Sequence, residues 1–331
     1  MTTAADTDQG GSGNPGVLIL TTGGTIASRR DAPMIEGPAL VRAVPEVLEH
    51  ADVEVEEFSV IGSSKMTPDN WLALAKRVNQ RFSENEALTG IVITHGTDTL
   101  EETAWFLNLT VNDSRPVVMV GSMRSSDESS ADGPANLINA VRVAAHPEAR
   151  GEGVLVVMNE DITAARDVRK SDNRRVQTFT GGAAGHLGSV DPDGIRFFAS
   201  VQQPHTADSE FDIADVDQLP EVAILSDYTG MEADTVVHFA ARPMDGLVIR
   251  TFAGGRMSAG MQSGLEVVAG QGVPIVVTSR VPNGRIVSPP DYSFPAVVAD
   301  RLQDNKARIL LMLALTRSQD PAEIARVFDT Y

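Results

Sequence analysis

The chain of 331 residues contains no cysteine, and this absence excludes disulfide bonds and thiolate chemistry. Basic residues are also few: 27 Lys and Arg stand against 45 Asp and Glu, which gives a formal net charge of −18. Nucleic acids and anionic membranes bind clustered basic side chains, so we expect neither as a partner. No apolar run approaches the ~20 residues that a membrane-spanning helix needs. The composition therefore disfavours nucleic-acid-binding and membrane-spanning functions.

The first 15 residues have neither a basic stretch nor an apolar core, so they do not have the pattern of a signal peptide. We predict that residues 1–15 form a disordered tail. The expected location, in the absence of a signal peptide in this sequence, is cytoplasmic.

Short apolar runs alternate with polar turns and helical segments over residues 16–201. This rhythm predicts a larger N-terminal α/β domain with a mostly parallel sheet and helices on both faces. Residues 202–220 are polar, with prolines near each end, and are predicted to be a linker. A second, smaller α/β pattern occupies residues 221–331. The expected fold is therefore α/β with two domains, of which the N-terminal one is catalytic.

A buried strand at residues 91–93 leads into the turn and helix of THGTDTLEETA. Asp98 and Glu101 have the spacing of a capping box, which predicts that the helix starts at Asp98. Thr97 and Asp98 would then lie at the carboxyl end of a strand and the amino end of a helix. Open α/β sheets bind ligands there, because free backbone N–H groups and the helix dipole point into the crevice.

Three further polar turns should meet at the same edge of the sheet, with the sequences TTGGTIAS, IGSSKM and GSMRS. The four turns supply hydroxyl nucleophiles and one acid, namely Thr25, Ser63, Ser64, Thr97, Asp98 and Ser122. The six histidines lack the spacing of a zinc site, so we expect no metal. A nucleotide phosphate loop and a G-x-S-x-G elbow are both absent. The set indicates hydroxyl chemistry on a small polar molecule.

Two of these turns resemble the signature motifs of the bacterial L-asparaginase family (the asparaginase/glutaminase superfamily). They are TGGTIA at residues 22–27 and THGTDTLEETA at residues 94–104. The likeness continues through GSSKMT, PVVMVGSMR, ADGPANL, GVLVVMN, RDVRK, TSRVP and KARILLMLALT, and covers nearly all of the chain from residue 17 onward. The resemblance implies hydrolysis of L-asparagine to L-aspartate and ammonia through an acyl-threonine intermediate, with no cofactor. It also implies a homotetramer (a dimer of dimers) with sites at the subunit interface.

The resemblance assigns roles to individual residues. The implied catalytic residues are Thr25, Thr97, Asp98 and Lys170, and the implied substrate-binding residues are Ser63, Ser64, Asp98 and Thr97. Thr25 would be the nucleophile, and Ser63 and Asp98 would hold the α-carboxylate and α-amino groups of the substrate. A threonine hydroxyl needs a base or a hydrogen-bond partner to attack, and a buried lysine could accept a proton through Thr97. The neighbouring His95 is expected to be structural.

The chain departs from the family pattern at three places. Many members carry a tyrosine soon after the first signature, whereas the tyrosines here are Tyr228, Tyr292 and Tyr331. We hypothesise that Tyr292 reaches the site of a neighbouring subunit and that Tyr292→Phe strongly lowers kcat. Ser64 stands where a longer Gln or Glu is common, and Gly254 where a side chain from a neighbouring subunit often approaches. These two departures predict poor use of glutamine.

Two alternative functions remain compatible with the sequence. A glutaminase-asparaginase with broad amide use would carry the same motifs. A non-catalytic amino-acid sensor on the same fold would fit the missing lid tyrosine, although the four intact catalytic positions count against it. Ammonia release from asparagine and from glutamine, measured separately, distinguishes the three functions.

Overall fold

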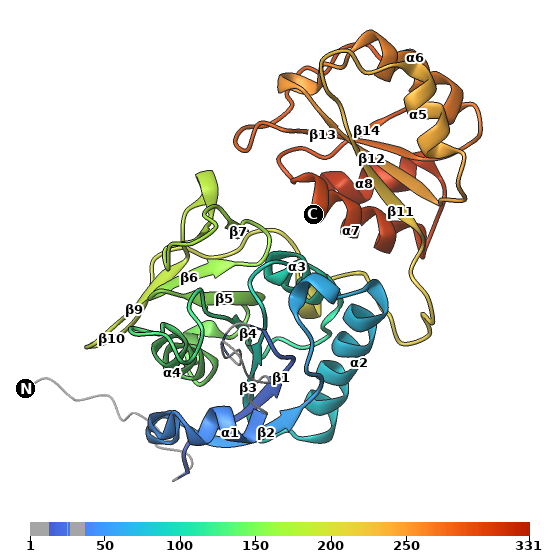
Figure 1. Ribbon diagram of the computed structural model, residues 1–331. Coiled ribbons are helices and arrows are strands. Elements are labelled where there is room, and N and C mark those ends of the chain that lie inside the picture. The colour runs from blue at the N-terminus through green and yellow to red at the C-terminus, as the bar shows by residue number, and fades with distance from the viewer. Residues whose placement is uncertain (1–12, 25, 27–36) are drawn as a thin grey trace, which may run out of the picture.

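The computed structural model describes residues 13–24, 26 and 37–331, and Figure 1 shows them as a larger and a smaller α/β lobe. The main strands of the larger lobe are β1 (Gly16–Thr21), β2 (Asp52–Glu57), β3 (Leu88–Thr94), β4 (Val117–Val120), β5 (Val154–Met158), β6 (Asp161–Ala164), β9 (Gly188–Asp191) and β10 (Gly194–Phe197). They form one sheet in the order β10-β9-β6-β5-β4-β3-β1-β2. The first five strands are parallel, and β6, β9 and β10 continue the sheet in antiparallel pairs. The predicted mostly parallel sheet is thus confirmed.

Helices cover both faces of this sheet, as predicted (Figure 1). Helices α1 (Gly37–Arg42) and α4 (Gly133–Ala144) pack on one face, and α2 (Pro68–Glu84) and α3 (Leu100–Thr110) on the other. Successive residues of a strand point to opposite faces. Accordingly, Leu18 and Leu20 of β1 pack with α2 and α3, while Val17 and Ile19 pack with α1 and α4.

The smaller lobe repeats this layered arrangement around four parallel strands. The strands are β11 (Val222–Ser226), β12 (Gly246–Thr251), β13 (Ile275–Ser279) and β14 (Val297–Val298), paired in that order. Helices α5 (Ala233–Ala240) and α6 (Ala259–Ala269) pack on one face, and α7 (Asp304–Leu315) and α8 (Pro321–Thr330) on the other. None of the described helices is long and apolar enough to cross a membrane.

Two helices begin at side-chain caps, and a third begins elsewhere than predicted. Thr67 caps α2 with a complete capping box to Asn70, and Asp320 caps α8. The predicted start of α3 at Asp98 is wrong, because α3 begins at Leu100 and its N-cap residue is Thr99. Instead of capping the helix, the side chains of Asp98 and Glu101 both bond to another segment of the chain, which is described with the site below.

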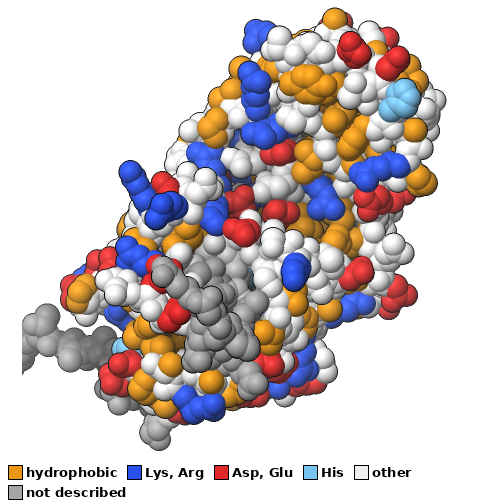
Figure 2. Space-filling view, in the orientation of Figure 1, with side chains coloured by type: hydrophobic (Ala, Val, Ile, Leu, Met, Phe, Trp, Pro, Cys, Tyr) orange, Lys and Arg blue, Asp and Glu red, His pale blue; other side chains and the backbone are white. Residues whose placement is uncertain are grey.

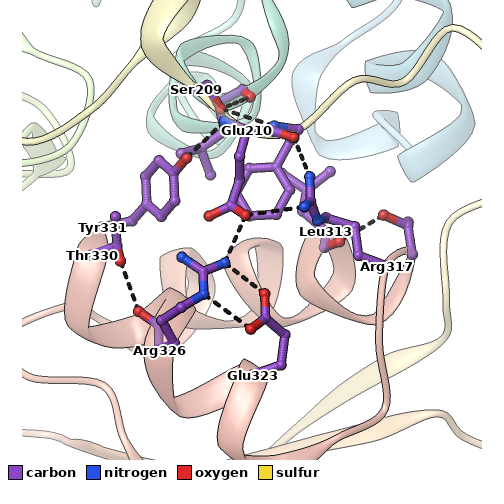
Figure 3. Close-up of polar contacts among 11 residues, drawn as sticks. Ser209, Glu210, Leu313, Arg317, Glu323, Arg326, Thr330 and Tyr331 are labelled. Carbon is purple, nitrogen blue, oxygen red and sulfur yellow. Dashed lines mark hydrogen bonds and ion pairs between the residues drawn. The ribbon is translucent and has the colours of Figure 1, made fainter.

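The two lobes share a continuous apolar core. Residues of α2 and α3 belong to the same cluster as residues of α7 and α8. The connection over residues 202–220 also contributes to that cluster through Phe211, Ile213 and Leu219. Around this core lie polar contacts of the connection with the last two helices, shown in Figure 3. Glu210 pairs there with Arg326, and its backbone N–H donates to the hydroxyl of Tyr331.

Candidate active site

The polar turns predicted to meet do lie together at the carboxyl edge of the large sheet. Ser63 Oγ accepts a hydrogen bond of 3.2 Å from the backbone N–H of Asp98, and the carbonyl of Ser63 accepts one of 2.9 Å from Thr99 Oγ1. The turn after β2 is therefore bonded to the turn after β3. Ser64 follows in the short helix η3 (Ser63–Lys65) and is exposed. Ser122 instead donates to the carbonyl of Arg124 in its own turn.

Glycines allow the first signature turn to pack against the second. Gly24 has φ +90°, and a Cβ placed on it would lie 2.2 Å from the backbone nitrogen of Gly96. Only glycine fits such a conformation and such a backbone contact. Gly24 directly precedes Thr25, the predicted nucleophile. Thr25 itself lies outside the described residues.

Lys170 joins the second signature from a two-stranded sheet that is separate from the large one. It belongs to the short strand β7 (Arg169–Lys170), which pairs with β8 (Phe179–Thr180). Its Nζ donates to Thr97 Oγ1 at 2.9 Å and to Asp98 Oδ1 at 2.8 Å. The side chain of Asp98 is 64% exposed, while that of Lys170 is 20% exposed and Thr97 is buried. The structure therefore brings together three of the four predicted catalytic residues, although Lys170 and Asp98 are 72 positions apart in sequence.

His95 lies beneath this turn in a chain of buried hydrogen bonds. Its Nδ1 bonds the carbonyl of Gly96 at 2.7 Å, so this nitrogen carries the proton. Its Nε2 lies 3.0 Å from Thr103 Oγ1, which also accepts a bond from Trp71 Nε1. The Thr103 hydroxyl must then donate to Nε2. Burial lowers the pKa of His95 to about 4, so the ring is neutral at pH 7 and acts as a structural support of the turn.

Comparison with known proteins identifies the family of this chain. Residues 16–203 match the family described as "Asparaginase, N-terminal", and residues 221–328 match "Glutaminase/Asparaginase C-terminal domain". The chain belongs to the asparaginase/glutaminase family. The resemblance drawn from the two signature motifs is thus confirmed.

Individual members of the family are similar over almost the whole chain. "L-asparaginase 2" of Bacillus subtilis is 40% identical over 330 residues, which cover 96% of this chain and 87% of the relative. "Glutaminase-asparaginase" of Pseudomonas fluorescens is also 40% identical, over 95% of this chain and 90% of the relative. The crystal structure of a "Probable Cytoplasmic L-asparaginase" from Campylobacter jejuni has a TM-score of 0.91 at 38% identity, over 96% of this chain and all of that one.

The sequence did not predict three residues that support the site in this chain of the asparaginase family. Glu101 accepts a hydrogen bond from the backbone N–H of Lys170, and Asn305 and Lys306 bond to Glu101 and to the segment before Lys170. The sequence pattern places Glu101 only in a capping box. The one signal for Lys306 is a charged residue beginning the apolar stretch KARILLMLALT. Within the described residues, no group of three His, Cys, Asp or Glu side chains is arranged to hold a metal ion.

Proposed function

We propose that the protein is an L-asparaginase, which hydrolyses the side-chain amide of L-asparagine to L-aspartate and ammonia. The observation that carries this proposal is the contact of Lys170 Nζ with Thr97 Oγ1 and Asp98 Oδ1 in a chain of this family. A hydroxyl bonded to an amine can relay the protons that hydrolysis of an acyl-threonine ester requires. A carboxylate beside it suits the ammonium group of an amino-acid substrate.

The proposed reaction proceeds in two stages. The hydroxyl of Thr25 attacks the amide carbon, and backbone N–H groups of the glycine-rich turns stabilise the oxyanion. The C–N bond breaks, the nitrogen takes the hydroxyl proton, and ammonia leaves an acyl-threonine ester. Water then attacks this ester, and its proton passes through Thr97 and the neutral Lys170 amine to the oxygen of Thr25 as the ester C–O bond breaks. Aspartate and the free Thr25 hydroxyl are released. Ser63, Ser64, Thr97 and Asp98 are proposed to bind the α-groups of the substrate.

Ammonia release from L-asparagine by the purified protein tests this proposal, with Thr25→Ala as the comparison. We expect rapid release by the natural protein and loss of release in the variant. If the folded natural protein releases no ammonia from L-asparagine or from L-glutamine, the proposal of an enzyme fails and the amino-acid sensor is favoured. Retained activity in Thr25→Ala would remove Thr25 as the nucleophile.

A glutaminase-asparaginase is the second candidate, favoured by the equal identity to the Pseudomonas relative of that name. The discriminating quantity is kcat/KM for asparagine against that for glutamine. One methylene is worth about 1–3 kcal/mol of discrimination in a fitted pocket. The short Ser64 and Gly254 are expected to favour asparagine, so equal kcat/KM values would support the second candidate.

We also propose a cytoplasmic homotetramer with sites between subunits, supported by the family resemblance and by the name of the Campylobacter relative. Sedimentation equilibrium should give four times the 35.2 kDa of one chain, and a monomer would contradict the assembly. The effect of Tyr292→Phe stays a prediction. Tyr292 donates to the carbonyl of Gly255 at 2.7 Å, and burial raises its pKa to about 12. Its influence on a partner's site would therefore pass through the Gly254–Gly255 turn.

A further inference from the structure

We propose that Glu101 is a positioning residue for Lys170, and that helix α7 of the smaller lobe, through Asn305 and Lys306, thereby fixes a catalytic group of the larger lobe. The inference rests on the proposed function, because that function gives Lys170 its role in amide hydrolysis. Within the described part of the chain, none of these three side chains bonds to Thr97 Oγ1 or Lys170 Nζ. They hold the segment from which Lys170 reaches the signature turn.

The strand that carries Lys170 has little support from sheet pairing. Strand β7 has two residues, and its register consists of Arg169 opposite Thr180 and Lys170 opposite Phe179. This pair forms a sheet of its own, separate from the eight-stranded one. A two-stranded ribbon of this size is marginally stable by itself. The position of Lys170 must therefore be fixed by other contacts.

Glu101 supplies one such contact from the first turn of α3. Its Oε2 accepts the backbone N–H of Lys170, and its Oε1 accepts a bond of 2.7 Å from Asn305 Nδ2 at the start of α7. Lys170 is thus held at both ends by one stretch of chain. Glu101 binds its backbone, while Thr97 and Asp98, four and three residues earlier, bind its Nζ.

Lys306 supplies the second contact from beneath the same segment. It is 3% exposed, and its Nζ donates to the carbonyls of Ala165, Arg166 and Val168 at 2.8, 2.8 and 2.6 Å. An ammonium group has three N–H donors, and all three are used here. Val168 is two residues before Lys170, so these bonds fix the chain that leads into β7.

The charges around Lys306 leave the ammonium form in place at neutral pH. Burial lowers its pKa to about 8, an effect opposed by Glu101 and Asp167 and reinforced by Arg166 and Arg169. A neutral amine has two N–H donors and would leave one of the three carbonyls without a donor. In Figure 2, acidic and basic side chains gather where the two lobes meet.

Helix α7 is itself anchored on the helix that carries Glu101. Trp105 of α3 donates from Nε1 to the carbonyl of Lys306 at 3.1 Å. The N–H of Lys306 donates to Asn305 Oδ1 at 2.8 Å, which fixes the orientation of the amide that bonds Glu101. The start of α7, the first turn of α3 and the segment before Lys170 therefore form one connected unit. Displacement of α7 would displace Lys170.

A double-mutant cycle with an exchange of charge tests the inference. In Glu101→Gln, the new amide must point its NH₂ group at one of two donors, the N–H of Lys170 or Nδ2 of Asn305. In Asn305→Asp, two carboxylates face each other. In the double variant, the new glutamine oxygen can accept from Lys170 while its NH₂ donates to the new aspartate. The second carboxylate oxygen can still accept from the N–H of Lys306.

We expect each single change to lower kcat for L-asparagine by about 10- to 100-fold, because a misplacement of a catalytic group by about 1 Å can lower the rate by that factor. KM should change by less than about 3-fold. The double variant should recover to within about 3-fold of the natural kcat. Glu102→Gln, at the next position of the same helix, is the matched control and should leave kcat unchanged. A merely structural role would lower stability without this kcat-specific loss and recovery.

Natural kcat in both single variants, or additive losses in the double variant, would overturn the inference. Should Glu101→Gln fail to fold, Asn305→Asp gives the same test from the side of α7. A crystal structure of each folded variant separates this inference from the proposed function, since it needs no activity. Lys170 Nζ should move by about 1 Å or more from Thr97 Oγ1 in the singles and return in the double. An unmoved Lys170 would overturn the inference even if the natural protein releases no ammonia.

Discussion

His95 and Lys170 lie on either side of the Thr97 turn, and their surroundings fit them for different tasks. His95 is fully buried, and both ring nitrogens are used in hydrogen bonds to Gly96 and Thr103. Lys170 is partly exposed and contacts two side chains of the signature motif. The His95 ring supports the backbone of the turn, while Lys170 Nζ contacts the side chains of Thr97 and Asp98.

The burial of His95 predicts a pH dependence of stability. Its pKa of about 4 in the fold lies below the 6.5 of a free histidine, so between these values the unfolded chain binds a proton that the folded chain does not. The free energy of unfolding must therefore fall as pH is lowered from 6.5 to 4. The contribution of His95 is complete above pH 6.5 and amounts to about 3 kcal/mol.

Denaturant unfolding at pH 7 and pH 4 measures this effect. From pH 7 to pH 4, the free energy of unfolding should fall less in His95→Gln than in the natural protein. His50→Gln is the control, because His50 lies outside this buried network, and it should keep the natural pH dependence. An unchanged dependence in His95→Gln would remove the histidine from this account.

The residues of the site were predictable from sequence to an unequal degree. The two signature motifs and the expected parallel strands were enough to predict that Ser63, Thr97 and Asp98 lie at one edge of the sheet. Lys170 could be assigned only through the resemblance, because a basic run is usually solvated. Glu101 was misassigned because a local capping rule fits its spacing. Its actual partner is Lys170, 69 positions away, and only the fold brings them together.

The strands and most helices of the larger lobe follow directly from local patterns. Apolar runs bounded by glycine and polar turns form buried parallel strands such as β1, β3 and β4, and the pair Thr67–Pro68 begins helix α2. The turns between elements have stricter steric requirements. Gly23 and Gly24 both have positive φ, and both face backbone atoms of other turns.

Substitution of Gly24 should therefore lower activity and stability far more than substitution of a nearby glycine that has free space beside its Cα. In Gly24→Ala, the new Cβ would lie 2.2 Å from a backbone nitrogen at φ +90°. We expect loss of activity and destabilisation by more than about 2 kcal/mol. Gly62 has φ −70°, and a Cβ placed on it would have no neighbouring atom within 4 Å, so Gly62→Ala should change stability by less than about 0.5 kcal/mol.

Thermal unfolding and ammonia release measured on both variants give the comparison. The two glycines lie in turns at the same edge of the sheet, so the pair controls for location. Equal stability of the two variants would show that the contact between the two signature turns does not restrict this position.

The association of the two lobes could not be predicted from the pattern of elements. The polar residues 202–220 indicate a linker, and Phe211 and Ile213 within it pack into the shared core. The polar contacts at this junction differ in kind. Glu210 is bound by arginines whose side chains are 45% exposed, whereas Lys306 is buried among carbonyls (Figure 3 shows the first group).

The exposure of each contact to solvent determines how much it contributes to the free energy of unfolding. Ion pairs near solvent contribute about 0–1 kcal/mol, so Glu210→Gln should lower the free energy of unfolding by less than about 1 kcal/mol and leave kcat unchanged. Removal of the Lys306 ammonium in Lys306→Met leaves three buried carbonyls without a donor, and should cost about 3 kcal/mol or more. Equilibrium unfolding in denaturant measures both. A larger effect of Glu210→Gln would contradict this ranking.

The proposed reaction is hydrolysis of the amide of L-asparagine with Lys170 acting through Thr97. It is tested most directly by kcat for ammonia release from L-asparagine by the natural protein, by Lys170→Met and by Lys76→Met, a control on helix α2. We expect rapid release by the natural protein and by Lys76→Met, and a loss of about 100-fold or more in folded Lys170→Met. Natural kcat in Lys170→Met would contradict it.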